Sequence, residues 1–342
     1  MLTKALKVVA LLTTMLCASA VNAGALEDGI AAIDKKNYAV AMAYFKQAAE
    51  KGDAVARFAI GVMYYKGAGV VQNYVEAMRW YGLAAIQGYA GAQHSIGIMY
   101  HIGEGVVQDF AEAMNWYRLA AEQGNAHSQH NIGNMYFKGE GVFQDYVEAM
   151  KWYRLSAAQG YASAQSNIGV MYDNGLGVVQ DYAEAMKWNR LAAAQGVVIA
   201  QFNIGAMYVK GLGVVQDYAE AMKWYRLAAA QSDAGAQLAI GVMYDNGEGV
   251  VRDYAEAMKW FRLAAEQGNA GAQILIGLMY YGGQGVVQDY VRAHMWLNLA
   301  ATKDAGAVKG RDIVAAKMTT QQIAAAQKLA SECQARDYKN CN

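Results

Sequence analysis

The chain has 342 residues, 29 basic and 29 acidic side chains, 55% hydrophobic residues and no proline. The high hydrophobic content excludes a disordered tail, and zero net charge gives no electrostatic reason to bind nucleic acid or an anionic membrane surface. At roughly 150 residues per domain the length predicts two or three domains, unless the chain is a repeat array.

The first 23 residues have the composition of a bacterial export signal. Lys4 and Lys7 give a short basic start, residues 8–16 form an apolar run, and small residues precede a cleavage point between Ala23 and Gly24. Residues 18–20 offer a second cleavage site, and an uncleaved signal anchor is the alternative. The apolar run is too short to span about 30 Å of hydrocarbon comfortably. We therefore expect a periplasmic or secreted mature protein with no membrane insertion after signal cleavage.

Residues 24–52 are expected to form two N-terminal capping helices, around residues 26–34 and 38–50. Behind them the chain repeats with a period of 36 residues. The segment from Tyr146 to Leu155 differs from the segment from Tyr218 to Leu227, two periods later, only where Val147 is replaced by Ala219. All seven tryptophans follow the period, and the seven repeats are 53–88, 89–124, 125–160, 161–196, 197–232, 233–268 and 269–304. A period of this size is typical of a solenoid.

Each repeat is predicted to contain two helices separated by a glycine-containing loop. In the fourth repeat the first helix should end at Gly175. The second should begin at Asp181, form a capping box with Glu184, and end at Gly196. Residues 305–342 should supply C-terminal capping helices and a tail, with Thr319 and Gln322 starting the last helix.

The repeat resembles the Sel1-like repeat, a relative of the tetratricopeptide repeat with a longer loop between its helices. The resemblance rests on Ala-x-Ala-Gln-x-x-Ile-Gly-x-Met-Tyr, on Gly-x-Gly-Val-Val-Gln-Asp-Tyr and on Glu-Ala-Met-Lys-Trp-Tyr-Arg-Leu-Ala-Ala. One departure is that Val or Phe stands where the family usually has a loop proline. The resemblance implies an all-α fold, a right-handed α/α solenoid whose first helices line a concave protein-binding groove.

Positions that hold the same residue in most repeats indicate the core. For the fourth repeat they are Ala164, Gln165, Ile168, Gly169, Met171 and Tyr172 in the first helix and Tyr182, Ala185, Met186, Trp188, Leu191 and Ala192 in the second. A tryptophan and tyrosine ladder that stacks a sugar or base is the alternative to core packing. Gly169 costs a helix about 1 kcal/mol, so its repetition predicts a close approach of two helices.

First-helix positions that vary between repeats fall at 3, 6, 7, 10, 13 and 14, counted from the repeat start, and trace one helix face roughly opposite the core. We expect this face to bind a partner protein of unknown identity; neutral drift on a solvated face is the alternative. The predicted partner-binding residues are Phe58, Tyr65, His94, His101, His127, His130, Asn131, Asn134, Phe137, Ser166, Asn167, Asp173, Phe202, Asn203, Asp245 and Tyr281.

Chemistry beyond binding is weakly indicated. Four histidines, His94, His101, His127 and His130, fall in two neighbouring repeats and raise a zinc site as an alternative to polar groove lining. No cysteine or well-placed carboxylate completes such a site, so no metal and no cofactor are expected. A cysteine-rich branch of the family is associated with penicillin binding and β-lactamase activity, but these repeats contain no cysteine and the chain has no Ser-x-x-Lys. The favoured function is a non-enzymatic adaptor. A small-ligand or cell-wall-fragment binder with weak β-lactamase-like activity is the alternative.

Two cysteines remain once the signal is removed, Cys333 and Cys341. Because the expected compartment is oxidising, they are predicted to form a disulfide that fixes the tail to the last helix.

Overall fold

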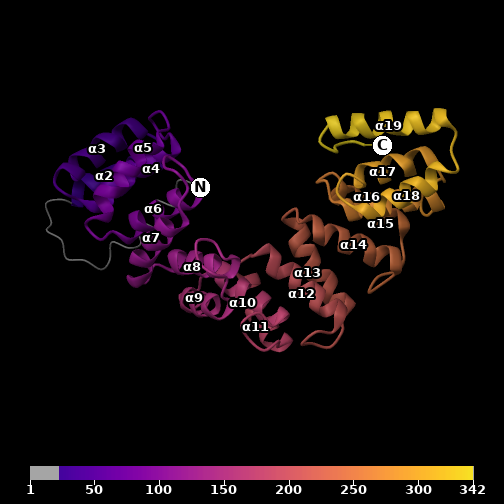
Figure 1. The fold of residues 1–342 in the computed structure, drawn as a ribbon, viewed down its shortest axis with the longest axis horizontal. Helices are drawn as coiled ribbons and strands as arrows, with labels where there is room; N and C mark the ends of the chain where they lie inside the picture. Colours follow the sequence, from indigo (N-terminus) through magenta and orange to yellow (C-terminus); the bar gives the residue numbers. More distant parts are fainter. Residues whose placement is uncertain (1–22, 342) are drawn as a thin grey trace. The chain divides into compact units, whose positions relative to one another are not determined.

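The computed structural model describes residues 23–341, so the predicted signal peptide lies outside the described residues apart from Ala23. The described residues are all-helical and contain no strand (Figure 1). The helices are α2 (Ala23–Asp34), α3 (Tyr38–Glu50), α4 (Ala54–Lys66), α5 (Tyr74–Ala85), α6 (Ala90–Ile102), α7 (Phe110–Glu122), α8 (Ala126–Lys138), α9 (Tyr146–Ala158), α10 (Ala162–Asn174), α11 (Tyr182–Ala194), α12 (Val198–Lys210), α13 (Tyr218–Ala230), α14 (Ala234–Asn246), α15 (Tyr254–Ala265), α16 (Ala270–Gly282), α17 (Tyr290–Ala300), α18 (Ala305–Ala315) and α19 (Thr320–Ala335).

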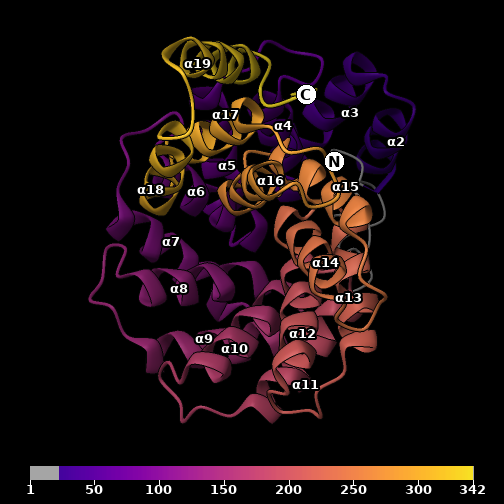
Figure 2. The same ribbon diagram turned by 90° about the vertical axis from the view of Figure 1, so that its right-hand side faces the viewer.

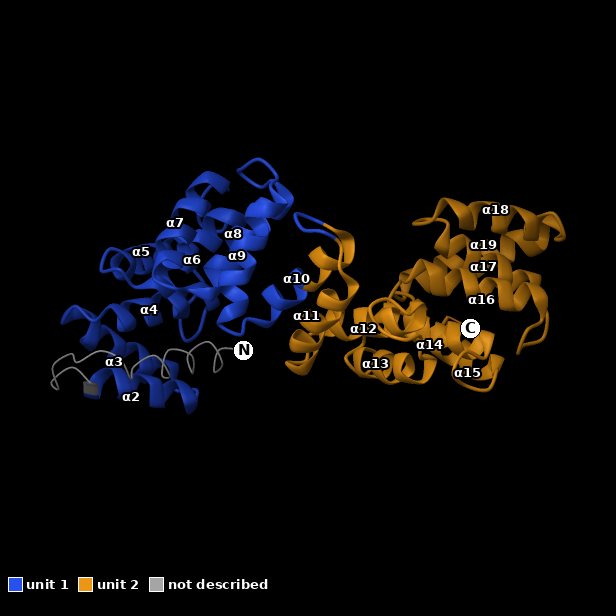
Figure 3. Ribbon diagram, turned by 90° about the horizontal axis from the view of Figure 1, so that it is seen from below, with its two compact units in different colours: residues 1–168, 176–179 blue, residues 169–175, 180–342 orange. Residues whose placement is uncertain are grey.

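The helices are arranged as an α/α solenoid, as the repeat pattern predicts. Two helices form each repeat, as α4 and α5 do in the first. The second helix of one repeat packs on the first helix of the next, and these pairs are α5 on α6, α7 on α8, α11 on α12, α13 on α14 and α15 on α16 (Figures 1 and 2). The chain divides into two compact units (Figure 3). Unit 1 comprises residues up to 168 together with 176–179, and unit 2 comprises 169–175 and the residues from 180 onward.

The predicted helix starts are confirmed, with one correction. The Asp181 side chain accepts hydrogen bonds from the N–H groups of Ala183 and Glu184, at 2.9 and 3.0 Å. The reciprocal half of the predicted capping box is wrong here, because the Asp181 N–H donates to the Tyr172 carbonyl at 3.0 Å and the Glu184 carboxylate pairs with Lys187. A complete capping box does form at Thr319, where the sequence also predicts one.

Glycine ends the helices where the sequence places it. Gly175 follows α10 with φ 66° and Gly196 lies beyond α11 with φ 84°, both in the left-handed region that side chains with a Cβ rarely adopt. In the loops, the Val or Phe at the family's proline position is 88–97% exposed. Nothing in the core therefore depends on this position, which explains why proline can be absent from it.

The core of each repeat is built around the mid-helix glycine. A Cβ on Gly133 of α8 would lie 2.6 Å from ring carbons of Tyr153 of α9, so glycine alone lets the two backbones approach across that ring. Tyr153 is 1% exposed. The expected close approach is therefore confirmed, and the same contact recurs at Gly61 with Tyr81, Gly97 with Tyr117, Gly205 with Tyr225 and Gly241 with Phe261.

The aromatic that anchors the core is one residue later than the sequence analysis expects. Trp188 is half-buried, as are the other repeat tryptophans except Trp296, which is 1% exposed. Leu191 was expected in the core and is 51% exposed, so that assignment is wrong. Adjacent helix positions are about 100° apart around the helix axis. When the core faces the residue after the tryptophan, which is position 29 of the repeat, Leu191 is turned out to solvent.

The C-terminal end has the predicted elements. Helices α18 and α19 both pack on α17. Cys333 and Cys341 form a disulfide with a Cα–Cα distance of 5.3 Å. Both cysteines are buried, in the same hydrophobic cluster as Trp296. The disulfide therefore joins the tail to the core of unit 2 and confirms the predicted pairing.

Candidate functional site

The predicted partner-binding residues lie on the first helices, but their face is not opposite the core. His127 is exposed and Ser166 is 3% exposed, while the other predicted residues are mostly half-buried. The reason is that position 6 packs on the core aromatic of its own repeat, as in the 5.7 Å ring separation of His94 and Tyr117. This helix face therefore forms joints between repeats as well as surface.

Three of the predicted histidines meet at one joint in unit 1. The rings of His94 and His127 are 5.7 Å apart, and Tyr161 contacts both His127, at 4.7 Å, and His130, at 5.0 Å. His94 Nδ1 also lies 2.9 Å from the Ser128 hydroxyl. We call His94, His127, His130 and Tyr161 the histidine cluster. No group of three or more His, Cys, Asp or Glu side chains suited to a metal ion occurs between residues 23 and 341.

Burial keeps the histidine cluster uncharged at neutral pH. Burial, reinforced by His127 and His130, lowers the pKa of His94 to about 3. Burial also lowers the pKa of His130 to about 4 and lowers that of His127. The cluster therefore contributes packing and hydrogen bonds, and a positive charge there would destabilise the joint.

We expect unit 1 to lose stability in mild acid. The histidine pKa values are lower in the folded chain than the ordinary value of about 6.5, so this contribution is complete above pH about 6.5 and is lost as pH falls toward 4. Unfolding midpoints measured from pH 7.5 to 4 should fall accordingly. His94→Phe should reduce the slope, because phenylalanine holds this position in Phe58 and Phe202 at similar distances from the core tyrosine. An unchanged slope in His94→Phe would show that the acid sensitivity comes from groups other than His94, such as His130 or the carboxylates.

Amide side chains extend the cluster toward the surface. Asn134 Oδ1 accepts hydrogen bonds from the Tyr153 hydroxyl, at 2.8 Å, and from Asn167 Nδ2, at 3.2 Å. Asn167 Nδ2 also lies 3.1 Å from His130 Nε2. The predicted residues Asn134, Asn167 and His130 thus belong to one hydrogen-bonded network.

Position 13 contributes side chains to the joint between two first helices. Tyr65 donates a hydrogen bond to Glu104 of the next repeat at 2.5 Å. Phe137 instead packs on Tyr146 of its own repeat, at 5.2 Å, as His101 packs on Phe110, at 5.1 Å. His101 Nε2 lies 3.3 Å from an oxygen of Glu140, the counterpart of Glu104.

A pocket of about 200 Å³ lies at the joint between α6 and α8. We call it the α6–α8 pocket. Tyr117 and Glu140 contribute to its wall, and the remaining lining residues are Ile98, His101, Ile102, Asn131, Asn134 and Lys138. Three residues of the predicted partner-binding set thus line the pocket, His101, Asn131 and Asn134.

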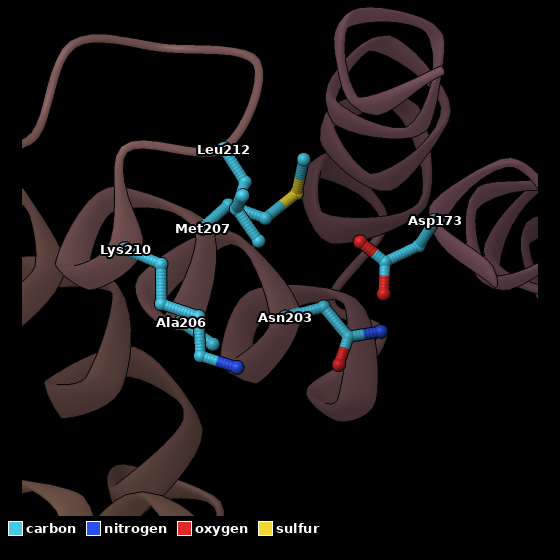
Figure 4. Close-up of a pocket in the computed structure, with 6 residues that line it drawn as sticks. All are labelled: Asp173, Asn203, Ala206, Met207, Lys210 and Leu212. Carbon is cyan, nitrogen blue, oxygen red and sulfur yellow. The ribbon is translucent and has the colours of Figure 1, made fainter. Parts of the chain in front are cut away.

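A smaller pocket of about 50 Å³ occupies the equivalent joint between α10 and α12 in unit 2. Figure 4 shows the Asp173 carboxylate facing the Asn203 amide, with Lys210 on the same helix as Asn203. Burial raises the pKa of Asp173, and Lys210 opposes that shift. Met207 and Leu212 supply apolar walls.

The structure does not bring every predicted residue to a pocket. Phe58 packs on Tyr89, Phe202 packs on Tyr225, and Tyr281 lies under the Lys317 ammonium. Asp245 has a buried Oδ1 without a hydrogen bond. These residues lie in separate joints.

The other lining residues of the α6–α8 pocket were not predicted from the sequence, and they are Ile98, Ile102, Tyr117, Lys138 and Glu140. Lys138 and Ile98 occupy positions 14 and 10, which vary between repeats, so the same criterion could have found them. Glu140 lies in the loop, where no helix periodicity indicates which side chains reach the pocket.

The repeat architecture agrees with a family model. The Sel1 repeat matches residues 18–53, 54–89, 90–125, 126–161, 162–197, 198–233, 234–269 and 270–304. The chain belongs to the Sel1 repeat family. The Sel1 match starts each repeat one residue later than the sequence analysis does, and its first segment covers residues assigned there to the signal and the N-terminal cap.

Solved Sel1 structures resemble the chain along most of its length. A Sel1 repeat protein from Oxalobacter formigenes is 33% identical with a TM-score of 0.65, over 72% of this chain and 97% of that one. A protective antigen of uropathogenic Escherichia coli, which displays an SLR fold, is 29% identical with a TM-score of 0.54, over 93% of each chain. No curated protein matches. The chain thus has a scaffold fold typical of protein–protein interaction, and none of its described helices is long and apolar enough to cross a membrane.

Proposed function

We propose that this Sel1 repeat chain is exported and acts as a non-enzymatic scaffold that binds a partner protein through the first helices of its repeats. The observation that carries the proposal is that first-helix residues which differ between repeats line the α6–α8 pocket, whereas repeated residues form the core. A solenoid can change its variable first-helix residues without losing the repeated residues that form its core.

Export is supported by the signal-like start and by the disulfide. A disulfide persists in an oxidising compartment such as the periplasm. Expression in a bacterial host should yield a periplasmic or secreted chain that starts at Gly24, as N-terminal sequencing would establish. A cytoplasmic chain that keeps residues 1–23 would refute export.

Partner binding should depend on exposed first-helix residues. We expect the triple change of Ile102, His127 and Lys138 to alanine to reduce capture of the partner from periplasmic extract by about tenfold or more, because truncating true contact residues costs roughly 1 kcal/mol or more each. The matched control changes Asn115, Lys151 and Lys223, which are exposed on second helices. Quantitative mass spectrometry compares the captured proteins.

If the control loses the partner and the first-helix variant keeps it, the binding face has been assigned to the wrong helices. The small-ligand alternative has its own measurement, which is binding of muropeptides and hydrolysis of penicillin by the purified protein. Activity in that measurement, with no difference in partner capture, would replace the scaffold proposal.

A further inference from the structure

Helix α19 covers a face of α17 that other second helices leave open. Met295, Trp296 and Leu299 are only 1%, 1% and 3% exposed, and they occupy positions 27, 28 and 31 of the last repeat. We call these three positions the outer face of a second helix. Helix α19 packs on α17 (Figures 1 and 2), and Leu299 shares a hydrophobic cluster with Ala330 and Cys333 of α19. The chain thus contains one example of a helix docked on an outer face.

The outer faces of α13 and α15 carry the same tryptophan and leucine without a cover. Leu227 and Leu263 are 50% and 45% exposed, and Trp224 and Trp260 are half-buried. Leucine nevertheless stands at position 31 in all seven repeats. A repeated apolar side chain that the fold leaves half in water is a candidate contact surface.

Lysine replaces methionine at the border of these two outer faces. Where α17 has Met295, α13 has Lys223 and α15 has Lys259, and both lysines form ion pairs, with Glu220 and Glu256. A lysine can keep its ammonium group in water while its methylenes pack on a neighbour. The faces of α13 and α15 therefore suit a docked helix with a polar border, held more weakly than α19 is on α17.

The side of α19 that faces inward shows what kind of helix fits. Its buried residues are Ala326, Ala330 and Cys333, which are four and three positions apart and lie on one stripe of the helix. Leu329 beside them is half-buried. Small residues on one helix leave room for large side chains on the facing helix, so the two surfaces interlock. A small-residue stripe thus matches an outer face of tryptophan and leucine.

We propose that the outer faces of α13 and α15 dock an amphipathic helix of a partner protein, and that the contact face of this helix carries small residues, as that of α19 does. Both faces belong to the two repeats that precede α17 in unit 2. The surface lies on second helices and takes a different occupant from the first-helix face, so it goes beyond the scaffold function proposed above. Peptide binding to second helices and partner capture by first helices are measured separately.

A peptide copy of α19 tests the proposal. The probe is residues 318–336 with Cys333→Ala and a fluorescein label, titrated into the full chain with its disulfide intact, so that the native α19 stays on α17. We expect saturable binding by fluorescence anisotropy and shifts of amide signals in α13 and α15 of ¹⁵N-labelled protein. A peptide with Ala326→Glu and Ala330→Glu should bind about tenfold more weakly or worse, because it buries carboxylates without partners. The matched control peptide carries Ala324→Glu and Ala325→Glu, which place the same charge on the exposed side of the helix.

Variants of the full chain locate the surface. Leu227→Lys combined with Leu263→Lys should weaken binding of the native peptide about tenfold or more, the usual effect of losing two true contact residues. The matched control is Val215→Lys with Val251→Lys, since these loop valines of the same unit are each 88% exposed and lie off the outer faces. Lys259→Met introduces the residue that α17 has and should tighten binding about threefold, because it adds apolar contact area. This gain tests the proposal even if the double leucine variant lowers the unfolding midpoint.

Binding that maps to α13 and α15, falls in the double leucine variant and rises in Lys259→Met supports the proposal. No binding, equal binding of the three peptides, or shifts confined to unit 1 or to first helices would overturn it. A chain that dimerises through the two leucines and does not bind the peptide would assign the surface to a second copy, which also contradicts the proposal.

Discussion

Replacing Tyr153 by alanine is expected to destabilise unit 1 by about 3–5 kcal/mol, the usual cost of truncating a buried aromatic side chain. Tyr153 is 1% exposed, lies against Gly133, and donates a hydrogen bond to Asn134 at 2.8 Å. Urea unfolding followed by circular dichroism would measure the change. Leu155→Ala on the same helix is the control, because that side chain is 51% exposed and its loss should cost far less.

The same tyrosine should be coupled to its glycine. Gly133→Ala in the native chain places a Cβ 2.6 Å from the Tyr153 ring and should be strongly destabilising. In a Tyr153→Ala background the added methyl has room, and alanine is favoured over glycine in a helix by about 1 kcal/mol. The double-mutant cycle should therefore show a favourable coupling. If the free-energy changes of the two single variants simply add in the double variant, the Tyr153 ring is not the reason why glycine is needed at position 133.

A gain in stability is expected in the fourth repeat, where asparagine stands in place of the core aromatic residue. Asn189 occupies the position of Tyr153 one repeat later, is 1% exposed, and has a buried Oδ1 without a hydrogen bond. Its Nδ2 contacts only the Met207 sulfur, at 3.8 Å. Asn189→Tyr should stabilise unit 2 by about 2–4 kcal/mol, since it removes an unsatisfied buried amide and buries a ring.

Gly169 makes this replacement feasible, because the glycine that accommodates a ring elsewhere is retained beside Asn189. Thermal unfolding measures the gain, and Asn115→Tyr on the exposed side of α7 is the control, with an expected change within about 0.5 kcal/mol. A lower midpoint for Asn189→Tyr would indicate that the joint has adapted around the asparagine and no longer admits a ring.

The periodic features of the fold were predictable, because the same residues recur at the same positions in seven repeats. Helix pairs, N-caps, glycine ends and the glycine contact all follow from residues that do not change. The choice between Trp152 and Tyr153 as core anchor did not follow, since both recur in most repeats and differ by one step of the helix. The fourth repeat obscures the pattern further, because Trp188 is followed there by Asn189 and the tryptophan is its one aromatic candidate.

The lining of the candidate site was only partly predictable for a different reason. Variation included His101, Asn131 and Asn134, which line the α6–α8 pocket, but it treated all variable positions as one surface. The structure divides them by packing: His94 and His130 are absorbed into a joint, whereas Lys138 and Ile102 remain accessible. Which side chains fill a joint depends on their lengths on two neighbouring helices, and a list of residues at one position does not contain that information.

The joints between repeats also bear on how such a chain can change its length. Arg118 donates to the Tyr136 hydroxyl, and the same bond joins Arg190 to Tyr208, Arg226 to Tyr244 and Arg262 to Tyr280, each pair 18 residues apart. Removing 36 residues between equivalent points would bring an arginine of one repeat to the tyrosine of a later one with the same spacing. Unequal recombination within such a coding sequence could therefore shorten or lengthen the array, and each new joint that follows one of these arginines would find its hydrogen-bond partner already in place.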